Sequence, residues 1–207
     1  MKSSNYVFAI CCSLLFAIGM QAQTARSTSV ANPALRQELL ERYKRDQAVR
    51  DEWIRKGVQH TDAAVMARVE AVDSENTARM RHIIKQYGWP GPELVGKDGT
   101  EAAFILVQHA DPAFQREVLP LVRDAYQANK LSGQDYALLL DRVLVREGKL
   151  QVYGTQAKSF DQWKGHEPVL EPIEDEANID RRRAEVGLPA LAEYLVMLKR
   201  MYYPKDK

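Results

Sequence analysis

The sequence has very little cysteine: Cys11 and Cys12 are the only two in 207 residues, and both lie in the first apolar run. If that run is removed as a signal segment, the rest of the chain cannot form a disulfide and must be stabilised by its hydrophobic core. Cysteine-based zinc sites are then excluded, and the four histidines are scattered without an HExxH motif. We therefore predict no metal site and no cofactor.

The sequence also lacks an excess of either charge. It contains 29 basic and 28 acidic residues, and loss of Lys2 with a signal segment would make the two signs equal. Nucleic-acid-binding proteins need a basic excess or a basic stripe, so no nucleic-acid partner is expected. No second long apolar run follows the first, which predicts no membrane contact after signal cleavage. The GxSxG motif and Gly-rich phosphate-binding loops are absent too.

The N-terminal residues have the pattern of a secretory signal peptide. Lys2 precedes VFAICCSLLFAIGM, which is short for a transmembrane span, and Ala22 is a small residue at the cleavage position. Lipidation is disfavoured because Cys11 and Cys12 lie in the middle of the apolar run. We expect an exported protein, either periplasmic or secreted. The expected organisation is a signal peptide at 1–22, a flexible leader at 23–31 and a single domain at 32–207.

The domain is expected to be mostly α, a single multi-helix domain with a short extended or β-hairpin-like insert. Apolar residues recur at helical spacing, and Ser, Thr, Asp or Asn precedes these segments while Gly follows them. The first helix is expected to start at Pro33 and to stop at Gly57, and the second to be capped by Thr61 or Asp62, with a restart at Asp73, before a loop from Gly88 to Gly99. The next helices are expected to begin at caps at Thr100, Asp111 and Ser132, with an interruption at Pro120 and a stop at Gly148. A short helix capped by Asp180 and a last helix that starts at Pro189 complete the expected domain.

One polar pair interrupts the apolar stripe of the first predicted helix. Asp46 and Arg50 lie on the same face as Leu39 and Trp53, four residues apart, so they can pair with each other. We interpret them as an ion pair at a contact between two helices.

His109 and Asp111 lie at a corner between two predicted helices. The imidazole could be a general base oriented by a carboxylate, or one ligand of a metal. Alternatively, Asp111 only caps the next helix and His109 bonds a free carbonyl. Asp141 points toward apolar neighbours, which should raise its pKa unless a partner meets it. Arg142 projects about 100° away around the helix, so His109 or one of residues 181–183 is the expected partner of Asp141.

The predicted insert is rich in side chains with donors and acceptors. In LQVYGTQ, Leu150 and Val152 alternate with polar residues, which is typical of a short strand, and PVLEPI is either its partner or an extended loop with prolines at both ends. Amides and a phenol suit recognition of neutral groups such as sugars or peptide bonds. They equally suit a buried network that attaches the insert to the helices. The polar residues concerned are Gln151, Tyr153, Thr155 and Gln156.

Several motifs together resemble a bacterial family catalogued only as a domain of unknown function. These are GWP followed by VG, then QHAD, DR at 141–142, GKLQVYGTQ and DRRRAEVGLPALAEY. The resemblance extends from the DQAVRDEW segment to Tyr194. It implies no activity, substrate or cofactor.

Three hypotheses for the function follow. The first, which we favour, is a binding or interaction module with a pocket for a small polar ligand or peptide, formed by Gln108, His109, Asp141, Arg142, Gln151, Tyr153 and Gln156. The second is a hydrolase-type enzyme in which His109 works with Asp111 or Asp141 as acid and base, and Arg182 or Arg183 stabilises an anion. The third is a purely structural helical protein whose polar motifs form internal networks.

Overall fold

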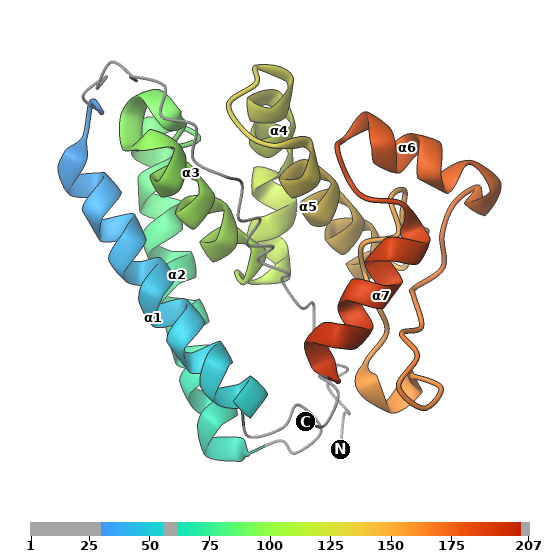
Figure 1. The fold of residues 1–207 in the computed structure, drawn as a ribbon. Coiled ribbons are helices and arrows are strands. Elements are labelled where there is room, and N and C mark those ends of the chain that lie inside the picture. The colour runs from blue at the N-terminus through green and yellow to red at the C-terminus, as the bar shows by residue number, and fades with distance from the viewer. Residues whose placement is uncertain (1–29, 56–61, 204–207) are drawn as a thin grey trace, which may run out of the picture.

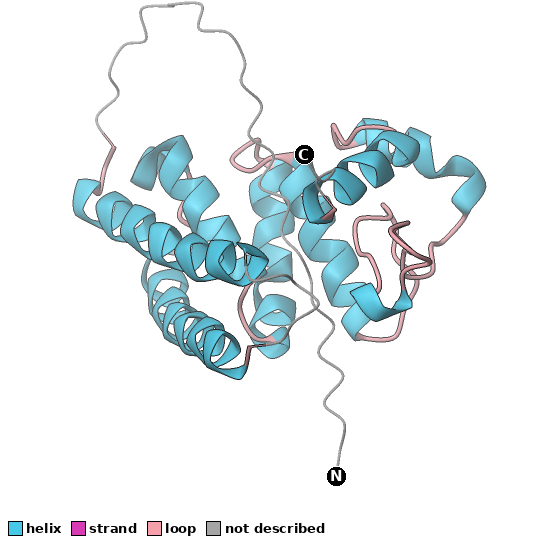
Figure 2. Ribbon diagram, turned by 60° about the horizontal axis from the view of Figure 1, so that its bottom comes forward, coloured by secondary structure: helices cyan, strands magenta, loops and turns pink. Residues whose placement is uncertain are grey.

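Helices make up nearly all of the regular structure in residues 30–55 and 62–203, the part of the chain that the computed structural model describes (Figures 1 and 2). Its α-helices are α1 (Pro33–Arg55), α2 (Ala63–Tyr87), α3 (Pro92–Gln108), α4 (Pro112–Gln127), α5 (Gly133–Arg146), α6 (Ile179–Glu185) and α7 (Leu191–Tyr202). Two 3-10 turns, η1 (Phe160–Gln162) and η2 (Glu176–Asn178), lie between α5 and α6. The prediction of a mostly helical single domain is confirmed. The expected signal peptide and Gly57 lie outside the described residues.

The first five helices share one hydrophobic core. α1 packs against α2 and α3, and α4 packs against α5. Each contributes at least one fully buried apolar side chain: Leu39, Met80, Phe104, Phe114 and Leu139. The second half of α3 is buried nearly all round, as its apolar sequence predicts. None of the described helices is both long and apolar enough to span a membrane.

Several predicted helix caps are confirmed. The Asp62 side chain accepts a hydrogen bond from the Ala64 N–H at 2.9 Å. Asp111 accepts one from the Phe114 N–H at 2.8 Å, and Ser132 accepts one from the Asp135 N–H at 3.0 Å. These side chains satisfy donors that the first helical turn leaves free, so the local sequence fixes where α2, α4 and α5 begin.

Two predicted boundaries in the first half of the chain are wrong. α2 continues through Asp73 instead of restarting there, because the Asp73 carboxylate bonds a side chain of α1 rather than its own backbone. α3 begins at Pro92, inside the expected loop, and Gly96 interrupts it with φ 75°. Thr100 is not a cap. Its hydroxyl lies 2.9 Å from the Pro90 carbonyl and 3.0 Å from the Gly96 carbonyl, which ties the two parts of α3 together.

Two predictions in the second half also need correction. Pro120 does not split α4, although it removes the backbone donor that the Arg116 carbonyl would otherwise bond. Asp180 does not cap α6. It accepts a hydrogen bond from the Leu191 N–H at 2.7 Å and so fixes the start of α7, two residues after Pro189.

The insert between α5 and α6 is extended, but its described residues form no regular strand (Figure 2). Isolated bridges pair Gln151 with Ile173 in parallel and Ala157 with Leu170 in antiparallel orientation. The short strand predicted for LQVYGTQ does not form, because several of its backbone N–H groups donate hydrogen bonds to the Asp141 side chain of α5 instead of to a neighbouring strand. A second apolar cluster, containing Trp163 and Tyr194, packs α7 against the insert.

Candidate functional site

A cavity of about 590 Å³ opens between α1, α2, the α3–α4 corner and α5. We call it the central cavity, and its volume lies in the range of small-molecule sites. Trp53 of α1 with Met66 and Val69 of α2 provide apolar lining. The polar lining includes Arg50, Asp73, Gln108, His109, Arg142 and Arg146.

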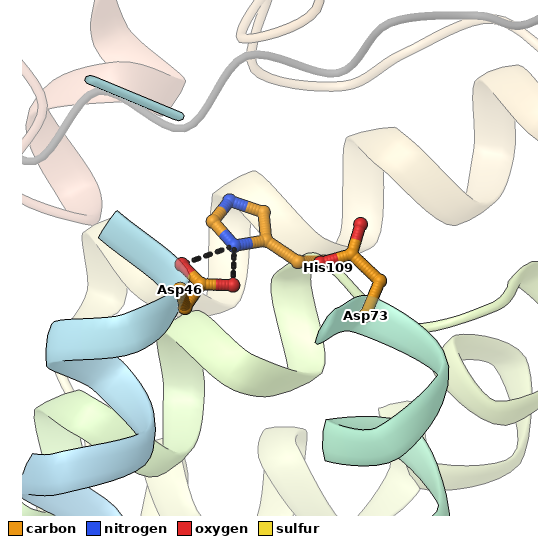
Figure 3. Close-up of side chains that lie close together, drawn as sticks. All are labelled: Asp46, Asp73 and His109. Carbon is orange, nitrogen blue, oxygen red and sulfur yellow. Dashed lines mark hydrogen bonds and ion pairs between the residues drawn. The ribbon is translucent and has the colours of Figure 1, made fainter. Parts of the chain in front are cut away.

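His109 lies at the end of α3 and is held by Asp46 of α1 (Figure 3). Its Nδ1 is 2.9 Å from each carboxylate oxygen of Asp46. The Asp46 side chain is fully buried and that of His109 is 5% exposed. A carboxylate can only accept hydrogen bonds, so Nδ1 carries the proton and Nε2 keeps its lone pair. Nε2 lies on the side of the ring away from Asp46 (Figure 3).

Arg50 connects this dyad to α2. Its Nη1 donates to Asp46 Oδ1 at 2.8 Å, and its Nη2 donates to the two oxygens of Asp73 at 2.7 and 2.9 Å. The ion pair predicted between Asp46 and Arg50 is therefore confirmed, and it lies at the contact between α1 and α2. Asp73 and His109 extend it into a four-residue network whose donors fix the orientation of the Asp46 carboxylate.

Burial keeps the His109 ring neutral. Burial is the main cause that lowers the pKa of His109 to about 4; the nearby Arg50 and Arg142 charges act in the same direction, and the hydrogen bond to Asp46 opposes the shift. Burial raises the pKa of Asp73 to about 6, against the opposing pull of Arg50. The imidazole is thus a neutral group with a free lone pair at physiological pH.

This shift predicts a pH-dependent contribution of His109 to stability. Above its ordinary pKa of about 6.5, His109 is neutral in both the folded and the unfolded chain. As the pH falls toward the folded pKa of about 4, only the unfolded chain binds the proton, so stability is lost. We expect the difference in unfolding free energy between wild type and His109→Gln to shrink by roughly 2 kcal/mol from pH 7 to pH 4.5. Urea denaturation at both pH values measures this difference. A difference that is the same at both pH values would mean that His109 titrates normally.

Asp46, Asp73 and His109 also form a set that could hold a metal ion, since one ligand atom of each lies within 4.8 Å of the others. Arg50, however, already places its guanidinium between the two carboxylates. A divalent ion bound by the same oxygens would meet this positive charge at close range. The residues present therefore fit an ion-pair network better than a metal site.

A second set of cations lies along α5. Arg142 and Arg146 are one helical turn apart and both line the central cavity. Arg142 donates to the Gln108 carbonyl at 2.5 Å, and Arg146 donates to Gln115 Oε1 at 2.6 Å. Among the described residues no carboxylate forms an ion pair with Arg146. Burial lowers the pKa of Arg146, and the more distant Asp111 charge opposes that shift.

Gln108 is a buried amide in the wall of the same cavity. Its side chain is fully buried, yet neither its Nε2 nor its Oε1 has a hydrogen-bond partner in the described part of the chain. A buried, unsatisfied amide is costly, so its presence beside a cavity is unusual for a residue that serves only packing.

The expected pairing of His109 with Asp111 or Asp141 is not what the structure shows. Asp111 lines the central cavity, but it caps α4 and lies 3.4 Å from Arg81. Asp141 is buried under the insert, and neither His109 nor an arginine of α6 is its hydrogen-bond partner. Burial raises the pKa of Asp141, and backbone hydrogen bonds from the insert oppose this effect.

Asp141 organises the insert by accepting hydrogen bonds from its backbone. Its oxygens accept from the N–H groups of Val152 at 2.7 Å, Tyr153 at 3.0 Å and Thr155 at 3.0 Å. The Thr155 hydroxyl is a further donor at 3.0 Å. This arrangement, which we call the Asp141 cage, replaces the β ladder that the alternating sequence predicts.

The other predicted site residues of the insert and α6 surround the Asp141 cage. The Gln151 amide donates to the Gln156 carbonyl at 3.0 Å and accepts from the Gln156 N–H at 2.8 Å. Arg182 donates to the Val152 carbonyl at 2.9 Å, and Arg183 donates to the Pro189 carbonyl at 2.7 Å. The two arginines thereby attach the insert to α6 and α6 to the start of α7. The predicted residues that lie at the central cavity are Gln108, His109, Asp111 and Arg142, and those that lie apart from it are Asp141, Gln151, Tyr153, Thr155, Gln156, Arg182 and Arg183.

Sequence reasoning missed the role of four residues, of which Arg50, Asp73 and Arg146 line the central cavity and Asp46 lies behind His109. Asp46 and Arg50 could be identified as a polar pair because both interrupt an apolar stripe. The sequence does not indicate that His109 also bonds Asp46. Asp73 was interpreted as a helix cap because the sequence around it resembles a helix start. Arg146 had no signal beyond its spacing from Arg142.

Comparison with known proteins identifies a family. The family of unknown function DUF6624 matches residues 33–207, which include every residue of the central cavity. No match is found among curated proteins or among solved structures.

Proposed function

Given that the chain belongs to DUF6624, a family of unknown function, we propose that it is an exported protein whose central cavity binds a small organic anion. The observation that carries this proposal is Arg146, a partly buried arginine in the cavity wall that is bonded to a neutral amide oxygen. Arg142 adds a second positive charge on the same wall. A ligand carboxylate or phosphate would supply the counter-charge and accept the remaining guanidinium donors.

The rest of the lining suits an organic ligand rather than a bare ion. Trp53, Met66 and Val69 offer an apolar surface for a carbon skeleton. The buried Gln108 amide provides a donor and an acceptor that the protein leaves unused in its described residues. The apolar first segment with Lys2 and Ala22 supports the export part of the proposal.

The test is thermal unfolding in the presence of inorganic phosphate, phosphate monoesters, small carboxylates and, for comparison, neutral sugars. A bound anion at one hundred times its Kd should add about 2.7 kcal/mol to the unfolding free energy and raise the midpoint. Arg146→Gln should weaken the effect at least about tenfold, because it removes a charge-assisted contact. Arg116→Gln is the matched control, since Arg116 is exposed and lies outside the cavity.

Stabilisation by anions that is equally strong in Arg146→Gln and Arg116→Gln would place the anion elsewhere. Stabilisation by sugars alone, or by no compound of the panel, would contradict anion binding by the cavity.

A further inference from the structure

We propose that the central cavity is catalytic and hydrolyses a phosphate ester, with His109 as the general base for an attacking water. This inference rests on the anion binding proposed above and adds a reaction to it. It follows from the position of the Asp46–His109 dyad, whose second nitrogen, Nε2, has no hydrogen-bond partner among the described residues, and from the cavity that His109 lines together with Arg146.

The base is prepared by residues behind it. Asp46 holds Nδ1–H with both oxygens at 2.9 Å, which fixes the tautomer and the ring plane. Arg50 fixes Asp46 from the other side at 2.8 Å. A lone pair on Nε2 can therefore accept a proton without rearrangement of the ring, and the Asp46 carboxylate can stabilise the imidazolium that forms.

The choice of a phosphate ester follows from a base and two cations that line the same cavity. His109, Arg142 and Arg146 line one cavity, so an anionic group held by Arg146 lies in the same space as Nε2. We take the group that Arg146 holds to be the same group that the water attacks. A phosphoryl group meets this condition because it carries the negative charge itself, whereas the carbonyl of an acyl ester is neutral. The guanidinium charges would stabilise the negative charge on the phosphoryl oxygens in the transition state. The apolar lining at Trp53 and Met66 would receive the leaving alcohol.

The reaction balances without an oxidant, a reductant or another co-reactant. The water oxygen forms a bond to phosphorus while the ester P–O bond breaks. The water proton passes to His109 Nε2 and from there to solvent, while the leaving oxygen, which lies opposite the attacking water, takes its proton from solvent. The products are inorganic phosphate and an alcohol, and His109 returns to its neutral form.

Substrate binding should also strengthen the base. The charged groups that face His109 are Asp46 and Arg50 from α1, Asp73 from α2 and Arg142 from α5. Together with burial, the two arginines disfavour the imidazolium in the empty cavity. A phosphate dianion beside Arg146 would offset their charge and favour proton uptake by Nε2. The ligand would thus raise the basicity of the group that acts on it.

The experiment uses the purified protein with p-nitrophenyl phosphate as substrate and inorganic phosphate as binding probe. His109→Gln should lower kcat at least about 100-fold and still bind inorganic phosphate, whereas His82→Gln, an exposed histidine of α2, should match wild type. Asp46→Asn should lower kcat about tenfold or more with KM unchanged, because Asp46 positions the base and does not touch the substrate. Arg146→Gln should raise KM and also lower kcat, because Arg146 both holds the phosphoryl group and stabilises its charge in the transition state.

Chemical modification of His109 is a second measurement, and it requires no substrate to be hydrolysed. Diethyl pyrocarbonate should modify His109 at Nε2, and inorganic phosphate should protect His109 but not His82, as read by peptide mass spectrometry. Absence of phosphate binding would overturn catalysis on a phosphate ester, and anion binding would be overturned with it only if the small carboxylates also failed to bind. Phosphate binding at Arg146 without hydrolysis of p-nitrophenyl phosphate, or with an unreactive His109, would leave binding intact and overturn catalysis.

Discussion

An Asp141→Ala variant should lose about 4 kcal/mol of unfolding free energy, the largest stability effect that we expect from a single substitution. The Asp141 carboxylate accepts hydrogen bonds from three backbone N–H groups and from the Thr155 hydroxyl. Alanine would leave these donors buried without an acceptor, and each unsatisfied donor costs about 1–3 kcal/mol before relaxation. Urea denaturation followed by circular dichroism measures the loss.

Asp124→Ala is the matched control for this measurement. Asp124 is exposed on α4, and its ion pair with the neighbouring Arg123 has an N–O distance of 3.4 Å, so its removal should change stability by less than about 0.5 kcal/mol. A loss below about 1 kcal/mol for Asp141→Ala would show that the insert does not depend on the Asp141 cage.

Replacement of Gln108 by methionine should raise the unfolding free energy of the ligand-free protein by about 1–2 kcal/mol, whereas Asp141→Ala lowers it. Methionine has nearly the same shape, and it removes two buried polar atoms that have no partner within the described residues. The backbone carbonyl of Gln108, which accepts from Arg142 and from the Gln115 amide, is retained. The same substitution should weaken binding of a ligand that uses the amide.

Gln115→Met is an unusually close comparison. Gln115 is also fully buried, but its amide donates to the Val107 carbonyl at 3.1 Å and to the Gln108 carbonyl at 2.7 Å, and accepts from Arg146. This variant should be destabilised by about 2 kcal/mol, because it leaves several partners unsatisfied. If both variants lose stability equally, Gln108 is part of the scaffold and its amide does not mark a ligand site.

The parts of the fold that could be predicted from the sequence are those that depend on neighbouring residues. The caps at Asp62, Asp111 and Ser132 involve hydrogen bonds over two or three residues, and the sequence alone specifies them. The prediction at Asp73 failed because the same residue type can bond a distant arginine instead of its own backbone. At Asp180 the bonded N–H belongs to the next helix.

The candidate site was harder to predict for the same reason. His109 could be identified as a polar residue at the end of an apolar helix. Its partner could not, since Asp46 is 63 positions away in the sequence, and Asp111 offered a nearer carboxylate. Asp141 was recognised correctly as a buried acid, but its hydrogen-bond donors are backbone groups, which every residue except proline carries and which therefore leave no mark on the sequence.

Asp46 and Asp141, the two fully buried carboxylates among the described residues, also differ in when they can form their contacts as the chain folds. The Asp141 cage closes a segment of only 11 to 14 residues, so the entropy of loop closure is small and α5 can order the insert early. The contact between Asp46 and His109 requires α1, α2 and α3 to be assembled around a separation of 63 residues. We therefore expect the central cavity to assemble later than the Asp141 cage, so that a mutation that slows docking of α1 would delay the site while the insert and α5 are already in place.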